Sequence, residues 1–312
     1  MFLILHLGGL YGLYIACFYS SFGLHLYIAL LNVLCGLGIL AGAHRLWAHR
    51  SYKAGVPLRV FLAFLQTAAV QNDIYEWSRD HRLHHKHSDT DADPHNANRG
   101  FFFSHIGWLM CKKHRQVKHM GKQLDMSDLW NDPIIRFQRY YYIPLAIVIR
   151  FTLFTYVPMN FWGVSIWDGI AVNMLALVVT LNHTWLVNSA AHIFGYKPYD
   201  INIRPNENRC VVYLALGEGY HNYHHTFPYD YSASEYGWKD AFNPATAFID
   251  LCAKYGLAYD LRKPSEDMID SRMKRTGNGG QKLTSIHNGL NYFFGVMSAS
   301  WTMVVYLLVK LF

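Results

Sequence analysis

The chain has 312 residues, of which 52% are hydrophobic, 16% aromatic and 16% charged. This composition is too apolar for an ordinary soluble domain and too polar for a bare bundle of membrane helices. The formal charge of +7 suits anionic lipid or a phosphorylated ligand, but no basic stripe or recognition motif accompanies it, so we expect no nucleic-acid partner. The five cysteines form no Cys-x-x-Cys motif and indicate reduced packing residues. We therefore expect membrane helices that carry a sizeable polar domain.

Apolar and polar segments alternate along the chain. Residues 1–43 contain two apolar stretches and predict a first transmembrane hairpin, and residues 44–142 are polar. Residues 143–187 contain a second apolar pair, and residues 188–285 are polar again. Each apolar stretch has about the 20 residues that a helix needs to cross a hydrocarbon core roughly 30 Å thick. The first stretch lacks the basic start and the cleavage site of a secretory signal peptide.

Residues 286–312 predict one more apolar helix, in which only Lys310 is charged. Its length suits a fifth membrane span. The alternative is a helix that lies on the bilayer or packs on the bundle, because residues 277–280 provide a flexible joint. The sequence leaves both arrangements open.

The distribution of basic residues predicts the orientation of these segments. Of the 28 lysines and arginines, 15 lie in residues 44–142 and 11 in residues 188–285, whereas the turns at residues 19–21 and 157–165 have none. The positive-inside rule then places both polar regions in the cytosol and both turns outside or in a lumen. All the histidine clusters described next are thereby placed on one side of the membrane.

A His-x-x-His-His pattern occurs once in each polar region. The two copies consist of His81, His84 and His85 and of His221, His224 and His225. On a helix this spacing puts three side chains along one face, and neutral imidazole is a good ligand for iron, copper and zinc. Solvated histidines beside a polar loop are the alternative interpretation, which two copies in so hydrophobic a chain disfavour.

Two further pairs of candidate ligands lie where apolar stretches end. His44 and His49 follow the second stretch; their spacing turns about 140° on an α-helix, so both bind one centre only if the helix ends or distorts there. Asn188 and His192 follow the fourth stretch at an i, i+4 spacing on one face. Nine histidines then converge, whereas one metal ion takes about four to six ligands. We therefore predict two metal ions that share them.

Three segments resemble the histidine boxes of membrane fatty acyl desaturases. The boxes are residues 44–49 (HRLWAH), 81–85 (HRLHH) and 221–225 (HNYHH). Their flanks are similar to those of stearoyl-CoA (delta-9 type) desaturases, most clearly at residues 71–81 (QNDIYEWSRDH), 185–192 (WLVNSAAH) and 217–231 (GEGYHNYHHTFPYDY). The likeness extends from the first apolar stretch to about residue 278.

The resemblance implies an all-α integral membrane protein of the endoplasmic reticulum, with four transmembrane helices in two hairpins and a cytosolic helical catalytic cap. It implies an acyl-CoA desaturase that uses a di-iron centre, O2 and two electrons to introduce a double bond, cis and near C9, into a saturated fatty acyl-CoA. The electrons would come from NADH through a reductase and cytochrome b5. A membrane fatty-acyl hydroxylase, or a desaturase of different regiospecificity, is the alternative with the same oxidant. A zinc- or iron-binding membrane protein without redox turnover is an alternative from another class.

The resemblance also assigns residues to sites. The predicted metal ligands are His44, His49, His81, His84, His85, Asn188, His192, His221, His224 and His225, with Asn188 acting through a water. The predicted substrate contacts are Asn72, Arg79, Asp80, Lys112 and Lys113 for CoA and Trp185 beside the acyl carbonyl. A basic strip against anionic membrane lipid is the alternative for the two lysines.

Four carboxylates are candidates to orient the imidazoles by hydrogen bonds. They are Asp80, Asp89, Asp91 and Glu218. Helix or loop caps and surface charges are an equally good interpretation of each.

The acyl chain of such a substrate needs an apolar tunnel between the spans. Residues 31–40, below the first box, are candidates for its far end, where Gly36 and Gly38 leave room for the chain. The alternative is that these glycines serve only close helix packing. Family members usually have a cytosolic arm ahead of the first span, whereas this chain begins at that span, so we expect that the arm is either missing from the sequence or dispensable.

Overall fold

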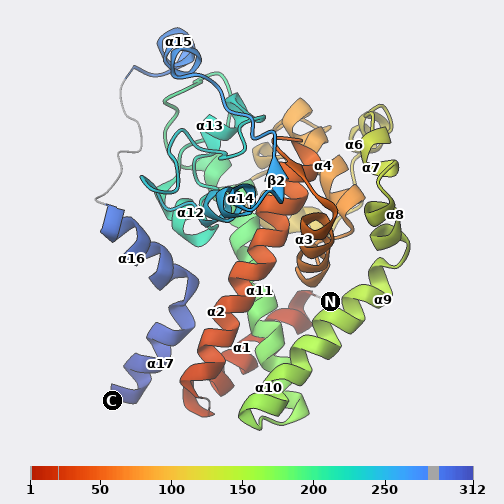
Figure 1. The fold of residues 1–312 in the computed structure, drawn as a ribbon, viewed down its shortest axis with the longest axis vertical. Coiled ribbons are helices and arrows are strands. Elements are labelled where there is room, and N and C mark those ends of the chain that lie inside the picture. The colour runs from red at the N-terminus through yellow and green to blue at the C-terminus, as the bar shows by residue number, and fades with distance from the viewer. Residues whose placement is uncertain (1, 20, 280–287, 312) are drawn as a thin grey trace.

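The computed structural model describes residues 2–19, 21–279 and 288–311 and is predominantly helical. Figure 1 shows long helices that carry a cap of short helices at one end, while the turns between the long helices lie at the other end. This arrangement agrees with the predicted all-α membrane protein in which both polar regions lie on one side.

Four helices are long and apolar enough to cross a membrane, as the sequence predicted. They are α1 (Phe2–Tyr19); α2 (Phe22–Leu37) with its continuation η1 (Gly38–Ala48); α9 (Tyr142–Ala146), η4 (Ile147–Leu153) and α10 (Phe154–Trp162) as the third span; and α11 (Ile166–Ile193). The segments η1 and η4 are π-helical. α11 continues past the predicted boundary at residue 187 and therefore carries Asn188 and His192 as helical residues.

Close helix contacts hold the spans together. α11 packs against α1, α2 and α10. Gly12 of α1 lies directly on the backbone of Ala171, where a Cβ atom would clash with the carbonyl oxygen, so a small residue lets the two helices approach. Arg150 is fully buried in the third span, and its guanidinium donates to the carbonyl oxygens of Ala68 (3.3 Å) and Asn173 (2.9 Å).

The cap is built from both polar regions. The first region forms α3 (Val56–Ala68), α4 (Ile74–His87), η2 (Ala97–Arg99), α5 (Phe101–His105), η3 (Gly107–Leu109), α6 (Arg115–Gly121), α7 (Ser127–Trp130) and α8 (Pro133–Tyr140). The second forms α12 (Arg209–Leu214), α13 (His221–Thr226), α14 (Pro244–Lys254) and α15 (Glu266–Thr276). Strands β1 (Lys53–Ala54) and β2 (Ala258–Tyr259) pair antiparallel, with Lys53 opposite Tyr259, and join the two regions.

The C-terminal apolar segment differs from the single helix that the sequence predicted. It forms α16 (Asn288–Ala299) and α17 (Trp301–Leu311), which meet at a bend of 78°. α16 packs on α12 of the cap and α17 packs on α1 and α2, so docking on two different surfaces accounts for the bend. The pair is at most a broken fifth span, and residues 286 and 287 of the predicted helix lie outside the described residues.

Candidate metal centre

The nine predicted histidines meet in two neighbouring groups. The first histidine cluster consists of His44, His49, His81, His85 and His224. The second histidine cluster consists of His84, His192, His221 and His225. Within each cluster the candidate ligand atoms lie within 4.8 Å of one another, a spacing that can hold a metal ion.

A π-helix brings His44 and His49 together. The amide of His49 donates to the carbonyl oxygen of His44 at 3.0 Å, an i to i+5 hydrogen bond at the end of η1. The i to i+5 hydrogen bonding of a π-helix brings residues five apart toward the same face, and the centroids of the two rings are 4.9 Å apart. This geometry is the helix distortion that the spacing of the first box required.

The other two boxes divide their histidines between the clusters. On α4, His81 and His85 join the first cluster and His84 joins the second. On α13 the assignment is reversed, because His224 joins the first cluster while His221 and His225 join the second. Residues at i and i+4 lie about 40° apart around a helix and the residue at i+3 lies to the other side, which explains why each box splits two to one.

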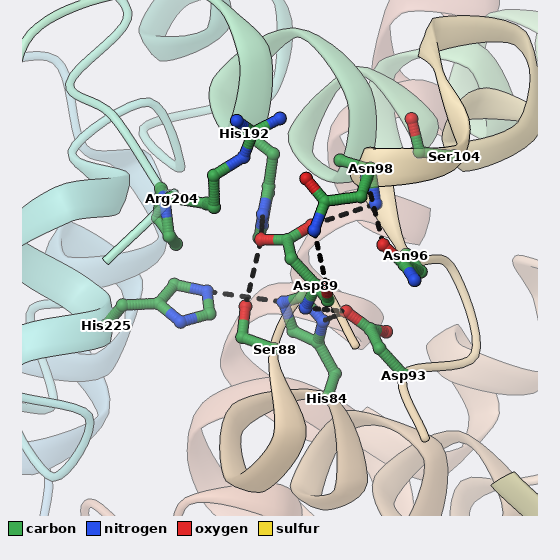
Figure 2. A network of polar contacts seen from close by, with 12 residues as sticks. His84, Ser88, Asp89, Asp93, Asn96, Asn98, Ser104, His192, Arg204 and His225 are labelled. Atoms are coloured by element: carbon green, nitrogen blue, oxygen red, sulfur yellow. Dashed lines mark hydrogen bonds and ion pairs between the residues drawn. The ribbon is translucent and has the colours of Figure 1, made fainter. Parts of the chain in front are cut away.

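Carboxylates hold one histidine from each of three elements. Glu218 accepts from Nδ1 of His44 (3.2 Å), and Asp93 accepts from Nδ1 of His84 (2.8 Å). Asp89 accepts from Nδ1 of His192 (2.9 Å), as Figure 2 shows beside the Asp93 contact. An ionised carboxylate only accepts hydrogen bonds, so the proton of each ring lies on Nδ1 and the Nε2 lone pair points into the cluster.

The chemistry of this donor set fits metal ions. Nε2 of His44 lies 2.9 Å from Nε2 of His224, and Nε2 of His192 lies 2.9 Å from Nε2 of His221. The lone pairs of His44 and His192 are fixed toward these partners, and a cation is the group that attracts several such lone pairs at once. Five and four imidazole donors therefore suit two metal ions better than a set of histidine–histidine hydrogen bonds.

Burial keeps most of the cluster histidines neutral. It lowers the pKa values of six histidines of the clusters well below 6.5, and the neighbouring imidazoles lower them further; the six are His49, His81, His85, His221, His224 and His225. Burial opposes the ionisation of Glu218, but His44 and Arg45 outweigh it and lower the pKa of that carboxyl to about 2. These six imidazoles are therefore neutral and Glu218 is ionised at neutral pH, whereas Asp93 and Asp89 raise the pKa of His84 against the effect of its burial.

Two of the four predicted orienting carboxylates make such contacts, namely Asp89 and Glu218. Asp80 instead pairs with Arg79 and Lys113. Asp91 is exposed, and its backbone carbonyl accepts from His114.

Asp93 was missed by the sequence reasoning. It is buried in the loop after the second box, and besides His84 it accepts from the backbone amides of Asp89 (2.8 Å) and His95 (3.0 Å). The proximity of an Asp-Pro-His segment to the box was the available signal.

The predicted substrate residues lie in three places. Arg79, Asp80 and Lys113 form one ion-pair network with Glu76, in which the Lys113 ammonium is 2.5 Å from Asp80 and 2.9 Å from Glu76. Lys112 lines a small surface pocket next to Lys113.

The other two predicted contacts lie on different elements. Asn72 is exposed in the turn before α4. Trp185 is buried on α11, and its ring meets Phe2 and His105 edge-on. Asn188 lies one turn before His192 on the same helix, and its role as a ligand stays a prediction.

A family model described as fatty acid desaturase matches residues 21–259. The chain belongs to the fatty acid desaturase family. This desaturase is 55% identical to a stearoyl-CoA desaturase of Homo sapiens over 89% of this chain and 77% of that protein. It is 54% identical to an acyl-CoA Delta(11) desaturase of Choristoneura rosaceana over 89% of this chain and 84% of that protein. It is 56% identical to a stearoyl-CoA desaturase 5 of Bos taurus over 79% and 73% of the two chains.

Proposed function

We propose that this desaturase introduces a double bond into a saturated fatty acyl-CoA, using two iron ions, O2 and two electrons. The observation that carries the proposal is the pair of adjacent clusters made only of histidine among the described residues. Relatives about 54–55% identical that are named for stearoyl-CoA and acyl-CoA substrates support the substrate class. The reaction removes two hydrogens from the chain, and O2 takes up these together with two electrons and two protons to form two waters.

The two histidine clusters would hold the irons, with Asn188 near the second cluster. Iron supplies the redox chemistry with O2 that abstraction from an unactivated methylene needs and that no side chain can supply. Zinc is disfavoured because it has no redox chemistry and is usually bound by four ligands, whereas the first cluster alone offers five. The carboxylates of Glu218, Asp93 and Asp89 fix the tautomer and direction of three ligands.

The cap provides charges for the CoA end of the substrate. Lys112 and Lys113 lie at the surface beside Arg79, and phosphate groups are recognised by such basic side chains. Lys113 would exchange part of its pairing with Asp80 for the phosphates. Trp185 would neighbour the acyl carbonyl, and the chain would continue between the spans, where water is excluded from the reacting carbons.

The position of the new double bond is proposed to be C9 with cis geometry. The relatives do not decide this position, since they include a Delta(11) desaturase as well as stearoyl-CoA desaturases. A desaturase of different regiospecificity is therefore the second candidate.

Electron delivery is proposed to depend on separate proteins, a cytochrome b5 and its NADH-dependent reductase. The chain contains no His-Pro-Gly-Gly haem-binding segment of the cytochrome b5 type. The basic residues of the polar regions offer a docking face for an acidic donor, and the same charge bias supports a cytosolic cap on an endoplasmic reticulum membrane protein.

The test is expression in a desaturase-deficient host, followed by mass spectrometry of double-bond positions in cellular fatty acids. We expect monounsaturated chains with the bond at C9, and none with a His224→Ala variant as matched control. Hydroxylated chains would support a hydroxylase instead. Tightly bound metal without acyl-CoA-dependent oxygen consumption, measured on purified protein with its electron donors, would refute redox turnover.

A further inference from the structure

A chain of hydrogen bonds surrounds Trp185, which is predicted to neighbour the acyl carbonyl. Its members belong to neither the histidine clusters nor the predicted CoA contacts, and they are His6 of α1, His105 of α5, and Asn182 and Ser189 of α11. Asn182, Trp185 and Ser189 follow one another at i, i+3 and i+7, so they share one face of α11. α1 and α5 both pack against this helix.

The hydrogen bonds run in one direction, because each link fixes the next donor. Nδ1 of His6 lies 2.8 Å from the carbonyl oxygen of Phe2, which only accepts, so this nitrogen carries the proton. Nε2 of His6 then accepts from the amide Nδ2 of Asn182 (3.3 Å), whose other hydrogen goes to the carbonyl oxygen of Val178 (2.8 Å). Oδ1 of Asn182 is left to accept from Nε2 of His105 (3.1 Å).

The chain ends at Ser189. With its proton on Nε2, the neutral ring of His105 accepts at Nδ1, and the hydroxyl oxygen of Ser189 lies 3.0 Å away. The same hydroxyl lies 2.9 Å from the carbonyl oxygen of Trp185, so one proton is shared between two acceptors. His105 therefore joins two positions of α11, Asn182 and Ser189, that lie on either side of Trp185 in the sequence.

The two imidazoles of the chain also lie against the indole ring of Trp185. His105 meets this ring edge-on with the centroids 5.7 Å apart, and His6 lies nearly parallel to it at 6.4 Å. Phe101 in turn stacks on the ring of His105, with centroids 5.4 Å apart. Because Asn182 is hydrogen-bonded to both imidazoles, neither of them can turn without breaking a hydrogen bond. The orientation of the indole is thereby restricted from two sides.

We propose that His105 is a positioning residue for desaturation, which holds Trp185 in the orientation that sets the register of the acyl chain against the histidine clusters. The inference rests on the proposed function, in which Trp185 neighbours the acyl carbonyl. Trp185 and His192 lie seven residues apart on one helix, about 10 Å along its axis, so α11 connects the carbonyl end of the chain rigidly with the second cluster. A misplacement of reacting groups by about 1 Å can lower a rate about 100-fold. A carbonyl that is held loosely would also let neighbouring methylene groups reach the oxidant.

The experiment expresses the full chain in a desaturase-deficient host and determines double-bond positions by mass spectrometry, with kcat and KM measured on purified enzyme and its electron donors. His105→Ala removes both links to α11. We expect the share of product with the bond at a neighbouring carbon to rise at least about tenfold, and kcat to fall about 10–100-fold while KM changes less than about threefold. A loss of folded protein would lower the amount of product without moving the bond, so the bond position separates positioning from stability.

Three further variants test the individual links. Glutamine can place an amide N–H close to the position of Nε2, so His105→Gln keeps the bond to Asn182 and should restore most of the single bond position. His6→Phe keeps an aromatic ring but accepts nothing from Asn182, and it should broaden the positions less than His105→Ala. His119→Ala is the matched control, because it makes the same change at an exposed histidine of α6 and should leave the product unchanged.

A double variant tests whether His105 acts through Trp185. Trp185→Phe should broaden the bond positions by itself, and the addition of His105→Ala to it should change the distribution little further. Broadening that adds up in the double variant would overturn the proposal.

The position of the double bond decides the remaining outcomes. An unmoved bond in His105→Ala, or equal broadening in His119→Ala, would overturn the proposal. If His105→Ala forms no product, His6→Phe decides by the same measurement, and an unmoved bond there has the same consequence. If the unaltered chain forms no double bond in this host, the proposed function itself is refuted before any variant is compared.

Discussion

Replacing Asp93 by Asn should weaken metal binding at the second histidine cluster. The carboxylate accepts from Nδ1 of His84 at 2.8 Å and, with its other oxygen, from the amide of His95 at 3.0 Å. An asparagine keeps one acceptor oxygen, so one of these buried donors faces an NH2 group and is left unpaired. An unpaired buried donor costs about 1–3 kcal/mol. Loss of a carboxylate that orients a metal-bound histidine typically weakens binding about 10–100-fold, which is roughly 1.4–2.7 kcal/mol, so both estimates agree.

The measurement is iron retained per chain after dialysis against increasing concentrations of a chelator. Asp93→Asn should lose half of its iron at about 10–100-fold less chelator than the unaltered protein. Asp91→Asn is the matched control, because it makes the same chemical change in the same loop at an exposed side chain. The reasoning would be refuted if Asp93→Asn retained iron like the unaltered protein, or if Asp91→Asn weakened binding as much.

Four further predictions follow from the clusters, the cap and the second span. His84→Ala, His192→Ala and His224→Ala should each abolish turnover and lower bound iron; full activity in any two would contradict shared centres. Acidification from pH 7 to pH 5 should release iron and lower the thermal midpoint. The clustered histidines have lowered pKa values in the folded protein, so as the pH falls through their ordinary value of about 6.5 they bind protons in the unfolded chain but not in the folded one, which favours unfolding. Iron content that does not change with pH would exclude this. Reduction by cytochrome b5 should slow as salt rises, and rates independent of ionic strength would count against a basic docking face. Gly36→Leu should shorten the accepted acyl chain, measured as turnover of acyl-CoAs that differ by two carbons; an unchanged profile in folded protein would remove residue 36 from the tunnel.

The structure separates the two glycines that the sequence treated alike. A Cβ atom on Gly38 would clash with the backbone of Leu65 and Gln66 on α3, so close packing explains this glycine. A Cβ atom on Gly36 would lie 2.5 Å from the end of the Leu216 side chain, which can move. Gly36→Leu therefore tests the tunnel, whereas Gly38→Leu would separate η1 from α3.

The spans and the clustering of the histidines followed from local patterns in the sequence. Apolar length predicted the four spans, and the i, i+3, i+4 spacing predicted that each His-x-x-His-His box lies on a helix with its three histidines turned toward the site; the division of each box between two clusters appears only in the structure. For His44 and His49 to reach one centre, the helix had to end or distort, as their spacing indicated. The sequence could not specify that this distortion is a π-helix. The sequence also could not give the role of Asp93 or the bend near Ser300. The bend depends on the docking of α16 and α17 on separate surfaces, and the role of Asp93 depends on how the loop after α4 folds back onto His84.

The two histidine clusters lie where the cap meets the membrane spans. The first histidine cluster combines η1, at the end of the second span, with α4 and α13 of the cap; the second combines α11, the fourth span, with the same two cap helices. Because α4 and α13 each contribute to both clusters, the first cluster is complete only when both helices are docked on η1, and the second only when both are docked on α11. Metal binding would therefore be coupled to docking of the cap. The carboxylates of Asp89 and Glu218, which reach His192 on one span and His44 on the other, stabilise the docked arrangement from the cap side.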